Sequence, residues 1–140
     1  PFIAMWKGTI EPGLSGALIS QVDLLSSLAA LTGGKIPSGY ASDSQNHMDA
    51  LLGKSEEGRD YLVQQGIIGM KAIRKGDWKY VPPGEVRNRV KINVNVYDKI
   101  HEPGALFYLP EDPNERTDLS SRYPKILAEM RALLETELAR

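Results

Sequence analysis

The clearest hydrophobic pattern in the chain has a period of two and lies between residues 86 and 97. One face of this segment carries branched apolar side chains, Val86, Val90, Ile92, Val94 and Val96. The other face carries polar and aromatic side chains, Arg87, Arg89, Lys91, Asn93, Asn95 and Tyr97. Successive side chains of a strand point to opposite faces, so this alternation predicts a strand with one buried face.

Shorter apolar runs after residue 60 predict further strands. Residues 61–63 form one, and residues 72–74 and 78–81 are typical of a hairpin that turns at Gly76 and Asp77. Another is expected over residues 105–109, and Pro110 ends it because proline has no N–H to give to a ladder. Together these segments predict an antiparallel sheet of about four strands.

Apolar side chains at three- and four-residue spacing predict two helices. The first is expected to begin after a cap at Ser15 and to end at Gly33 and Gly34. Its apolar stripe is Leu18, Ile19, Val22, Leu25, Leu28 and Ala29. The second begins at Pro124, where the missing N–H costs nothing, and runs to Arg140. Its stripe, which we expect to cover one face of the sheet, is Ile126, Leu127, Met130, Leu133, Leu134 and Leu138.

These elements predict an α+β fold in two parts. Residues 1–55 hold a short strand over residues 2–6, the first helix, and a loop rich in Gly, Pro, Ser and Asp with one helical turn at residues 48–52. Residues 56–140 hold the four-stranded antiparallel sheet and the long C-terminal helix.

Composition excludes several kinds of chemistry. The chain of 140 residues has no cysteine, which rules out disulfides and thiolate catalysis. Its two histidines, His47 and His101, are far apart in sequence, so we expect no metal site. A formal net charge of −1 gives no overall field for a nucleic acid or an anionic membrane, and no apolar run is long enough to span a bilayer. No catalytic residue can be named.

Residues 106–119 carry a recognisable motif. Their sequence fits Leu-(Phe/Tyr)-x-Leu-x-x-Asp-Pro-x-Glu-x-x-(Asn/Asp)-Leu, which resembles the strand and turn near the C-terminus of the sulfatase family. Three other stretches resemble the same family in the same order, namely residues 1–6, 21–33 and 72–79. The catalytic signature of that family, Cys or Ser followed by x-Pro-x-Arg, does not occur here.

The resemblance implies that the chain is the C-terminal portion of an arylsulfatase-like enzyme, which hydrolyses sulfate esters. Residues 1–55 would be the last strand, helix and loop of a large α/β catalytic domain, and residues 56–140 its C-terminal subdomain. The parent would use formylglycine and Ca²⁺, whereas this chain would hold no cofactor and would be inactive alone. Its partners would be the missing catalytic domain and a sulfated small molecule or carbohydrate. The first helix would then expose the apolar stripe that normally packs on the absent domain, unless the fragment self-associates. The sequence does not indicate a location, and the resemblance favours the periplasm or the cell exterior.

The candidate substrate-binding residues are a basic stripe and two histidines. Arg87, Arg89 and Lys91 project from one strand face at intervals of about 6.6 Å, which fits repeated sulfates on a polymer. Charged residues of this kind also keep an exposed strand soluble, so both explanations stay open. His47 and His101 lie in polar loops. Each is either an ordinary surface histidine or a hydrogen-bond donor to a sugar hydroxyl or a sulfate oxygen.

The remaining distinctive residues have structural explanations. Trp78 beside the hairpin turn is expected to pack in the core rather than to stack on a sugar. Asp112, Glu115 and Asp118 are expected to cap the turn after residue 110. Two other functions stay open, a free-standing module that binds anionic polymers through the basic stripe, and a part of a phosphatase-like relative of the sulfatases.

Overall fold

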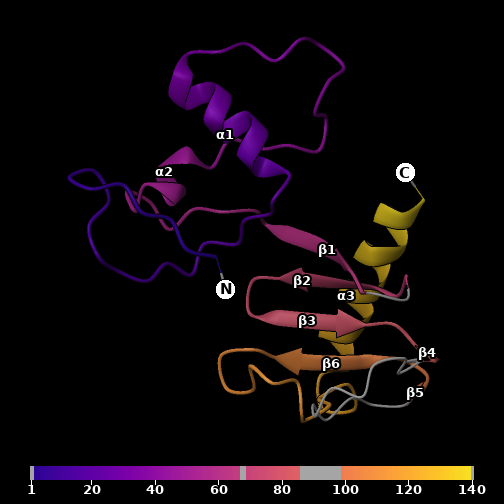
Figure 1. Ribbon diagram of the computed structural model, residues 1–140. Helices are drawn as coiled ribbons and strands as arrows, with labels where there is room; N and C mark the ends of the chain where they lie inside the picture. Colours follow the sequence, from indigo (N-terminus) through magenta and orange to yellow (C-terminus); the bar gives the residue numbers. More distant parts are fainter. Residues whose placement is uncertain (1, 67–68, 86–98, 140) are drawn as a thin grey trace. The chain divides into compact units, whose positions relative to one another are not determined.

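The computed structural model describes residues 2–66, 69–85 and 99–139, and Figure 1 shows their arrangement into helices and strands. The chain divides into two compact units, Pro1–Asp60 and Tyr61–Arg140. The first unit contains two helices among its described residues, and the second contains the strands and the long C-terminal helix. The strand predicted over residues 86–97, with Arg87, Arg89 and Lys91, lies outside the described residues.

The first unit contains the helices α1 (Asp23–Thr32) and α2 (Met48–Leu51), connected by loops. α1 ends at Gly33, whose φ of 69° is readily adopted by a residue without a Cβ. The N–H of Gly34 donates to the carbonyl of Ala29 at 2.8 Å, which satisfies one of the last carbonyls of the helix. The predicted helix end is therefore confirmed.

The structure differs from prediction at two places in the first unit. Residues 2–6 do not form a strand, and the carbonyl of Trp6 instead accepts hydrogen bonds from the N–H groups of Thr9 and Ile10 within a turn. α1 begins at Asp23 rather than after Ser15. The hydroxyl of Ser15 donates to Glu56 at 3.0 Å, so that this side chain binds a distant loop instead of capping the helix. Periodicity could not reveal this, because the competing partner lies far away in sequence.

The second unit is built on a four-stranded antiparallel sheet. Its strands are β1 (Tyr61–Gln65), β2 (Lys71–Lys75), β3 (Trp78–Val81) and β6 (Ala105–Tyr108), in the order β1-β2-β3-β6. A second pairing joins the short strands β4 (Gly84–Glu85) and β5 (Lys99–Ile100). The predicted α+β fold with a four-stranded antiparallel sheet is confirmed, as is the hairpin of β2 and β3.

The long helix α3 (Pro124–Leu138) packs on one face of this sheet, as Figure 1 shows. The buried side chains that join helix and sheet are Ile73, Tyr80, Leu106, Leu127, Met130 and Leu134. A smaller apolar cluster is formed by Ile100, Ala105 and Phe107. Both clusters include side chains of β6, and neighbouring residues of a strand point to opposite faces. The core of this unit therefore extends across both faces of β6.

Trp78 belongs to the apolar layer between sheet and helix. Its ring centroid lies 4.9 Å from that of Tyr108 and 5.0 Å from that of Tyr123, in tilted arrangements that aromatic pairs favour. It also packs against the buried cluster under α3. The prediction of a packing role for this side chain is confirmed.

The turn after β6 is held to the free edge of that strand. The carboxylate of Asp118 accepts a hydrogen bond from the N–H of Leu106 at 3.0 Å, and the N–H of Leu119 donates to the Leu106 carbonyl at 2.8 Å. Within the turn, Asp112 accepts from the N–H groups of Arg116 and Thr117, each at 2.7 Å. These contacts satisfy backbone groups that an edge strand would otherwise leave open.

Gly104 allows the chain before β6 to approach β3 closely. Its φ is 107°, and a Cβ at this position would lie 2.6 Å from a ring carbon of Tyr80 and 2.7 Å from the Val81 carbonyl oxygen. The hydroxyl of Tyr80 also donates to the carbonyl of Pro103 at 3.1 Å. The residue before Ala105 must therefore lack a side chain.

We expect Gly104→Ala to lower the free energy of unfolding by at least about 2 kcal/mol, because it combines overpacking with left-handed backbone strain. Urea unfolding followed by circular dichroism measures the change. Gly13→Ala is the matched control, since nothing lies within 4 Å of its Cβ position. Equal unfolding midpoints for the two variants would show that the close approach is not required.

Candidate functional site

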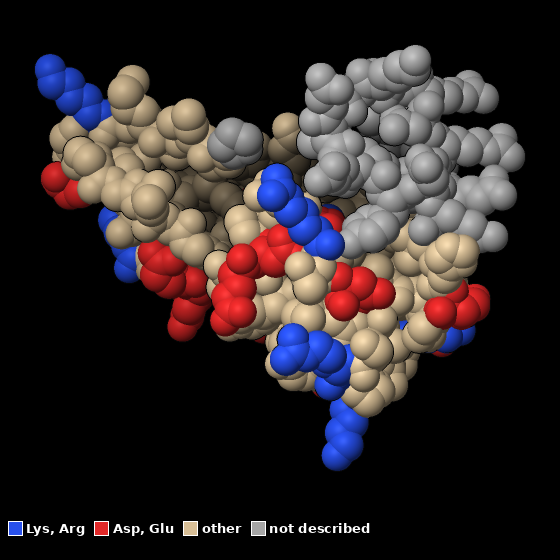
Figure 2. All heavy atoms as spheres, turned by 90° about the horizontal axis from the view of Figure 1, so that it is seen from below, with Lys and Arg blue, Asp and Glu red and all other residues tan. Residues whose placement is uncertain are grey.

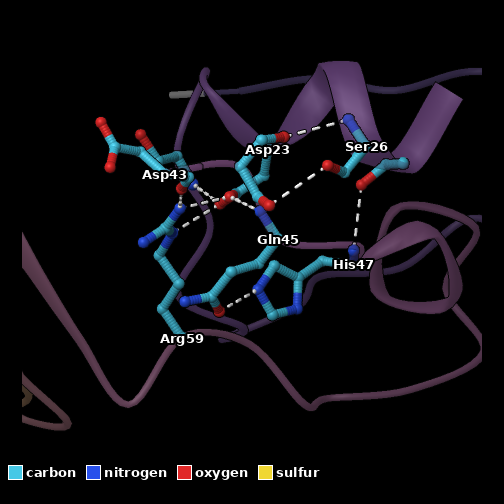
Figure 3. A network of polar contacts seen from close by, with 9 residues as sticks. Asp23, Ser26, Asp43, Gln45, His47 and Arg59 are labelled. Carbon is cyan, nitrogen blue, oxygen red and sulfur yellow. Dashed lines mark hydrogen bonds and ion pairs between the residues drawn. The ribbon is translucent and has the colours of Figure 1, made fainter. Parts of the chain in front are cut away.

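His47 lies at the end of a polar network that fastens the loop of residues 43–47 to α1 (Figure 3). The network is organised around Asp23, whose side chain is only 1% exposed. Its carboxylate accepts hydrogen bonds from the N–H groups of Ser20 and Gln45, at 2.8 and 2.9 Å. A loop that would otherwise have free backbone donors is thus held by one carboxylate.

Arg59 completes the surroundings of this carboxylate. Its Nε lies 2.7 Å from Asp23 Oδ2 and its Nη2 lies 2.5 Å from Oδ1, a bidentate pairing that suits the planar guanidinium. Nη2 also donates to the carbonyl of Asp43. The single side chain of Arg59 therefore connects α1, the loop and the end of the first unit.

The environment of Asp23 lowers the pKa of its carboxyl group. Burial alone raises the pKa of a carboxyl, but the hydrogen bonds from Arg59, Gln45 and Ser20 favour the ionised form and outweigh it. The net effect lowers the pKa of Asp23 from 3.8 to about 2. The carboxylate is therefore charged at any ordinary pH.

Two serines of α1 hold the rest of the loop. The N–H of Ser26 donates to the hydroxyl of Ser44 at 3.0 Å, and the Ser26 hydroxyl donates to the Ser44 carbonyl at 3.1 Å. One position along, the N–H of His47 donates to the hydroxyl of the fully buried Ser27 at 2.9 Å. The backbone of His47 is consequently fixed to the helix.

The ring of His47 borders a hollow of about 320 Å³ on the first unit. Nε2 of the ring lies 3.1 Å from Oε1 of Gln45. The lining residues are Ala30, Leu31, Asn46, His47, Met48, Asp49, Ala50, Ser55 and Glu57. Since the ring is positioned both through its backbone and through Nε2, this predicted histidine has a preorganised geometry.

His101 lies in the second unit, in the connection that leads into β6. The side chain is exposed, and its carbonyl accepts a hydrogen bond from the N–H of Gly104 at 2.8 Å. The Glu102–Pro103 peptide bond that follows is cis. His47 and His101 thus belong to separate units, each in a loop whose backbone is held by hydrogen bonds.

A second hollow, of about 430 Å³, lies beside the motif turn in the second unit. It is lined by Gln64, Arg74, Asp77, Lys79, Leu109, Pro110, Pro113 and Glu115. Lys79 Nζ lies 2.6 Å from Glu115 Oε1, and Glu115 has a positive φ of 55°. The sequence predicts that Glu115 caps the turn, but its carboxylate instead pairs with Lys79 of β3. This pairing needs the strand and the turn to meet in space, which sequence spacing does not show.

Within the described ranges, no three His, Asp or Glu side chains are grouped as metal ligands, and none of the helices combines the length and the apolar character of a membrane span. On the face drawn in Figure 2, acidic and basic side chains lie next to one another rather than in separate regions.

Comparison with known proteins gives a consistent set of relatives. No protein-family model matches the chain. The N-acetylgalactosamine-6-O-sulfatase of Bacteroides thetaiotaomicron is 34% identical over 141 residues, covering 97% of this chain and 26% of that protein. Arylsulfatase A of Bos taurus is 31% identical over 150 residues, covering 99% of this chain and 29% of that protein. The chain thus spans less than a third of the length of these relatives.

Solved structures agree with the sequence comparison. One solved structure comes from work on the metabolism of multiple glycosaminoglycans by Bacteroides thetaiotaomicron. The match covers 96% of this chain and 28% of the chain in that structure. Its TM-score is 0.79 and its sequence identity 34%. A sulfatase from a Pseudoalteromonas species matches with a TM-score of 0.73 at 20% identity, which shows the fold alone.

We expect acid to remove part of the stability of the first unit through Asp23. A carboxyl whose pKa falls from 3.8 to about 2 on folding contributes stability above pH 4, and this contribution is lost as the pH falls toward 2. The loss amounts to about 2 kcal/mol. Urea unfolding at pH 5 and at pH 2 measures it.

Asp23→Asn serves as the test variant and the exposed Glu11→Gln as its control. The Asn variant should lack this part of the pH dependence and should be less stable at pH 7, because Arg59 loses its charged partner. If Asp23→Asn kept the full pH dependence of the unmodified protein, the assignment to this carboxyl would be wrong.

Proposed function

Because the chain belongs to the sulfatase family, of which it represents a C-terminal portion, we propose that the intact protein is a sulfuric ester hydrolase. The proposal rests on the 34% identity to an N-acetylgalactosamine-6-O-sulfatase over 97% of the chain. This relative favours a sulfated carbohydrate as the substrate over a simple aryl sulfate. Fold alone does not support a substrate class, so the substrate proposed here follows that of the named relative.

In this proposal the chain covers one side of the catalytic portion and shapes the rim of the substrate pocket. The support comes from α1 and the residue before it, whose apolar side chains Val22, Leu25, Leu28 and Leu31 are between 40% and 56% exposed. Exposed apolar side chains along one helix mark a surface that another part of the protein covers. Alone, the chain would bury this stripe by self-association.

The reactive groups would come from the rest of the intact protein. A formylglycine supplies the nucleophile for sulfate esters in this family, and Ca²⁺ offsets the negative charge on the sulfate oxygens. The described residues of this chain have no cluster of acidic or histidine side chains that fits such an ion. We therefore assign to the chain neither the cofactor nor a catalytic residue.

The residues that would contact substrate are His47, His101 and the basic stripe Arg87, Arg89 and Lys91. The backbone of His101 is fixed by its bond to Gly104, while its ring has no hydrogen-bond partner among the described residues. An exposed ring on a fixed backbone suits a hydrogen bond to a sugar hydroxyl or a sulfate oxygen. The three basic residues would pair with successive sulfates along a polymer.

We expect the isolated chain to have no sulfatase activity and the intact protein to have it. The chain supplies a rim and a supporting surface, while the intact protein also contains the reactive groups. Hydrolysis of a 6-sulfated N-acetylgalactosamine and of an aryl sulfate, each with Ca²⁺, measures the difference. Turnover by the pure isolated chain would refute the assignment of the reactive groups to the rest of the protein.

We expect substitutions of the proposed contact residues to weaken substrate binding selectively. A triple variant with Arg87, Arg89 and Lys91 changed to Ala should bind sulfated polymer at least about tenfold more weakly, since each charged contact contributes. His101→Ala should raise the KM for a single sulfated sugar. Lys35→Ala, an exposed cation in the first unit, is the control. Unchanged polymer binding by the triple variant would leave the stripe with a solubility role only.

A further inference from the structure

We propose that the hollow beside His47 binds the uncharged part of a carbohydrate through its hydroxyl groups. The inference rests on the proposed function in that the intact protein acts on a carbohydrate. It goes further by assigning a site and a ligand chemistry within this chain. At about 320 Å³ the hollow lies at the small end of the range for ligand sites, which suits one small polar molecule.

The hydrogen-bonding groups of the hollow are mainly acceptors. Nε2 of His47 lies 3.1 Å from Oε1 of Gln45, and in the tautomer that donates to this oxygen Nδ1 of the ring is an acceptor. The carboxylates of Asp49 and Glu57 also line the hollow, and neither has a hydrogen bond or ion pair among the described residues. Three acceptors that have no partner among the described residues therefore line the same hollow.

The donors of the hollow are fewer. Asn46 uses its Oδ1 to accept from the N–H of Met48 at 3.1 Å, which leaves its amide nitrogen to donate. The hydroxyl of Ser55 accepts from the N–H of Glu57 at 2.9 Å and keeps its own proton to donate. A ligand with several O–H groups, each able to donate and to accept, matches this set.

The charge of the lining decides which part of a sulfated sugar fits. Two carboxylates line the hollow, and no Lys or Arg is among its lining residues. A sulfate group has no proton to donate and is negatively charged, so it would face acceptors of like charge. Sulfate is therefore excluded from this hollow, and the notion that His47 binds a sulfate oxygen is less favourable than a bond to a hydroxyl.

The hollow is built in advance of binding. Asp23 and Arg59 fasten the loop that carries Gln45, and Ser27 fixes the backbone of His47. Ala30 of α1 and Met48 of α2 supply apolar lining for the C–H groups of a sugar ring. A ligand consequently has to order few protein groups on binding, which favours affinity.

The test measures binding of uncharged N-acetylgalactosamine to the intact protein by isothermal titration calorimetry. Glu57→Gln and His47→Ala are the test variants, because each removes an acceptor whose side chain does not hold the polar network around Asp23. We expect each to weaken binding at least about tenfold, as for the loss of a hydrogen bond to a charged or buried group. Glu11→Gln, an exposed substitution outside the hollow, should bind like the unmodified protein.

Sulfatase activity and inhibition by inorganic sulfate are measured on the same variants. Loss of sugar binding with unchanged inhibition by sulfate supports a hydroxyl-binding hollow. Equal sugar affinity in the unmodified protein and both variants, or no sugar binding by the unmodified protein, overturns it. If the intact protein binds the sugar as described but hydrolyses no sulfate ester, the hollow stands and the proposed function fails.

Discussion

The carboxylate of Asp23 is the constraint on which the first unit depends. It has almost no contact with solvent, and it accepts hydrogen bonds from two loop N–H groups and from Arg59. Without these partners, a buried charge would be very unfavourable. The loop that places His47 is therefore fixed to α1 by electrostatics rather than by an extensive apolar core. The apolar side of α1, in contrast, remains exposed.

The second unit depends on apolar packing around β6. Leu106 packs under α3, while Ala105 and Phe107 belong to the cluster with Ile100. The motif turn then returns along the edge of β6 through Asp118 and Leu119. The motif that resembles the sulfatase family thus includes residues that form hydrogen bonds along the edge of β6, shortly before the chain enters α3. Residues that resemble the family motif are therefore also residues that stabilise this part of the second unit.

The sequence predicted those features that depend on neighbouring residues. The hairpin at Gly76, the long helix from Pro124 and the packing of Trp78 follow from turn chemistry, periodicity and side-chain size. The prediction failed where a residue distant in sequence determines which hydrogen bond or ion pair a side chain forms. Ser15 binds Glu56 instead of capping α1, and Glu115 pairs with Lys79 instead of capping its turn. His47 could be named as a candidate, but the hollow beside it depends on residues brought together by the fold.

This chain is the C-terminal portion of a sulfatase, and we propose that the intact protein hydrolyses a sulfate ester. The most direct measurement is to sequence the coding region upstream of Pro1. We expect Cys or Ser followed by x-Pro-x-Arg, in which the Cys or Ser is the precursor of the formylglycine, together with an early Asp-Asp pair for Ca²⁺. A start codon close to Pro1, or an upstream Ser or Thr nucleophile without that signature, would contradict it.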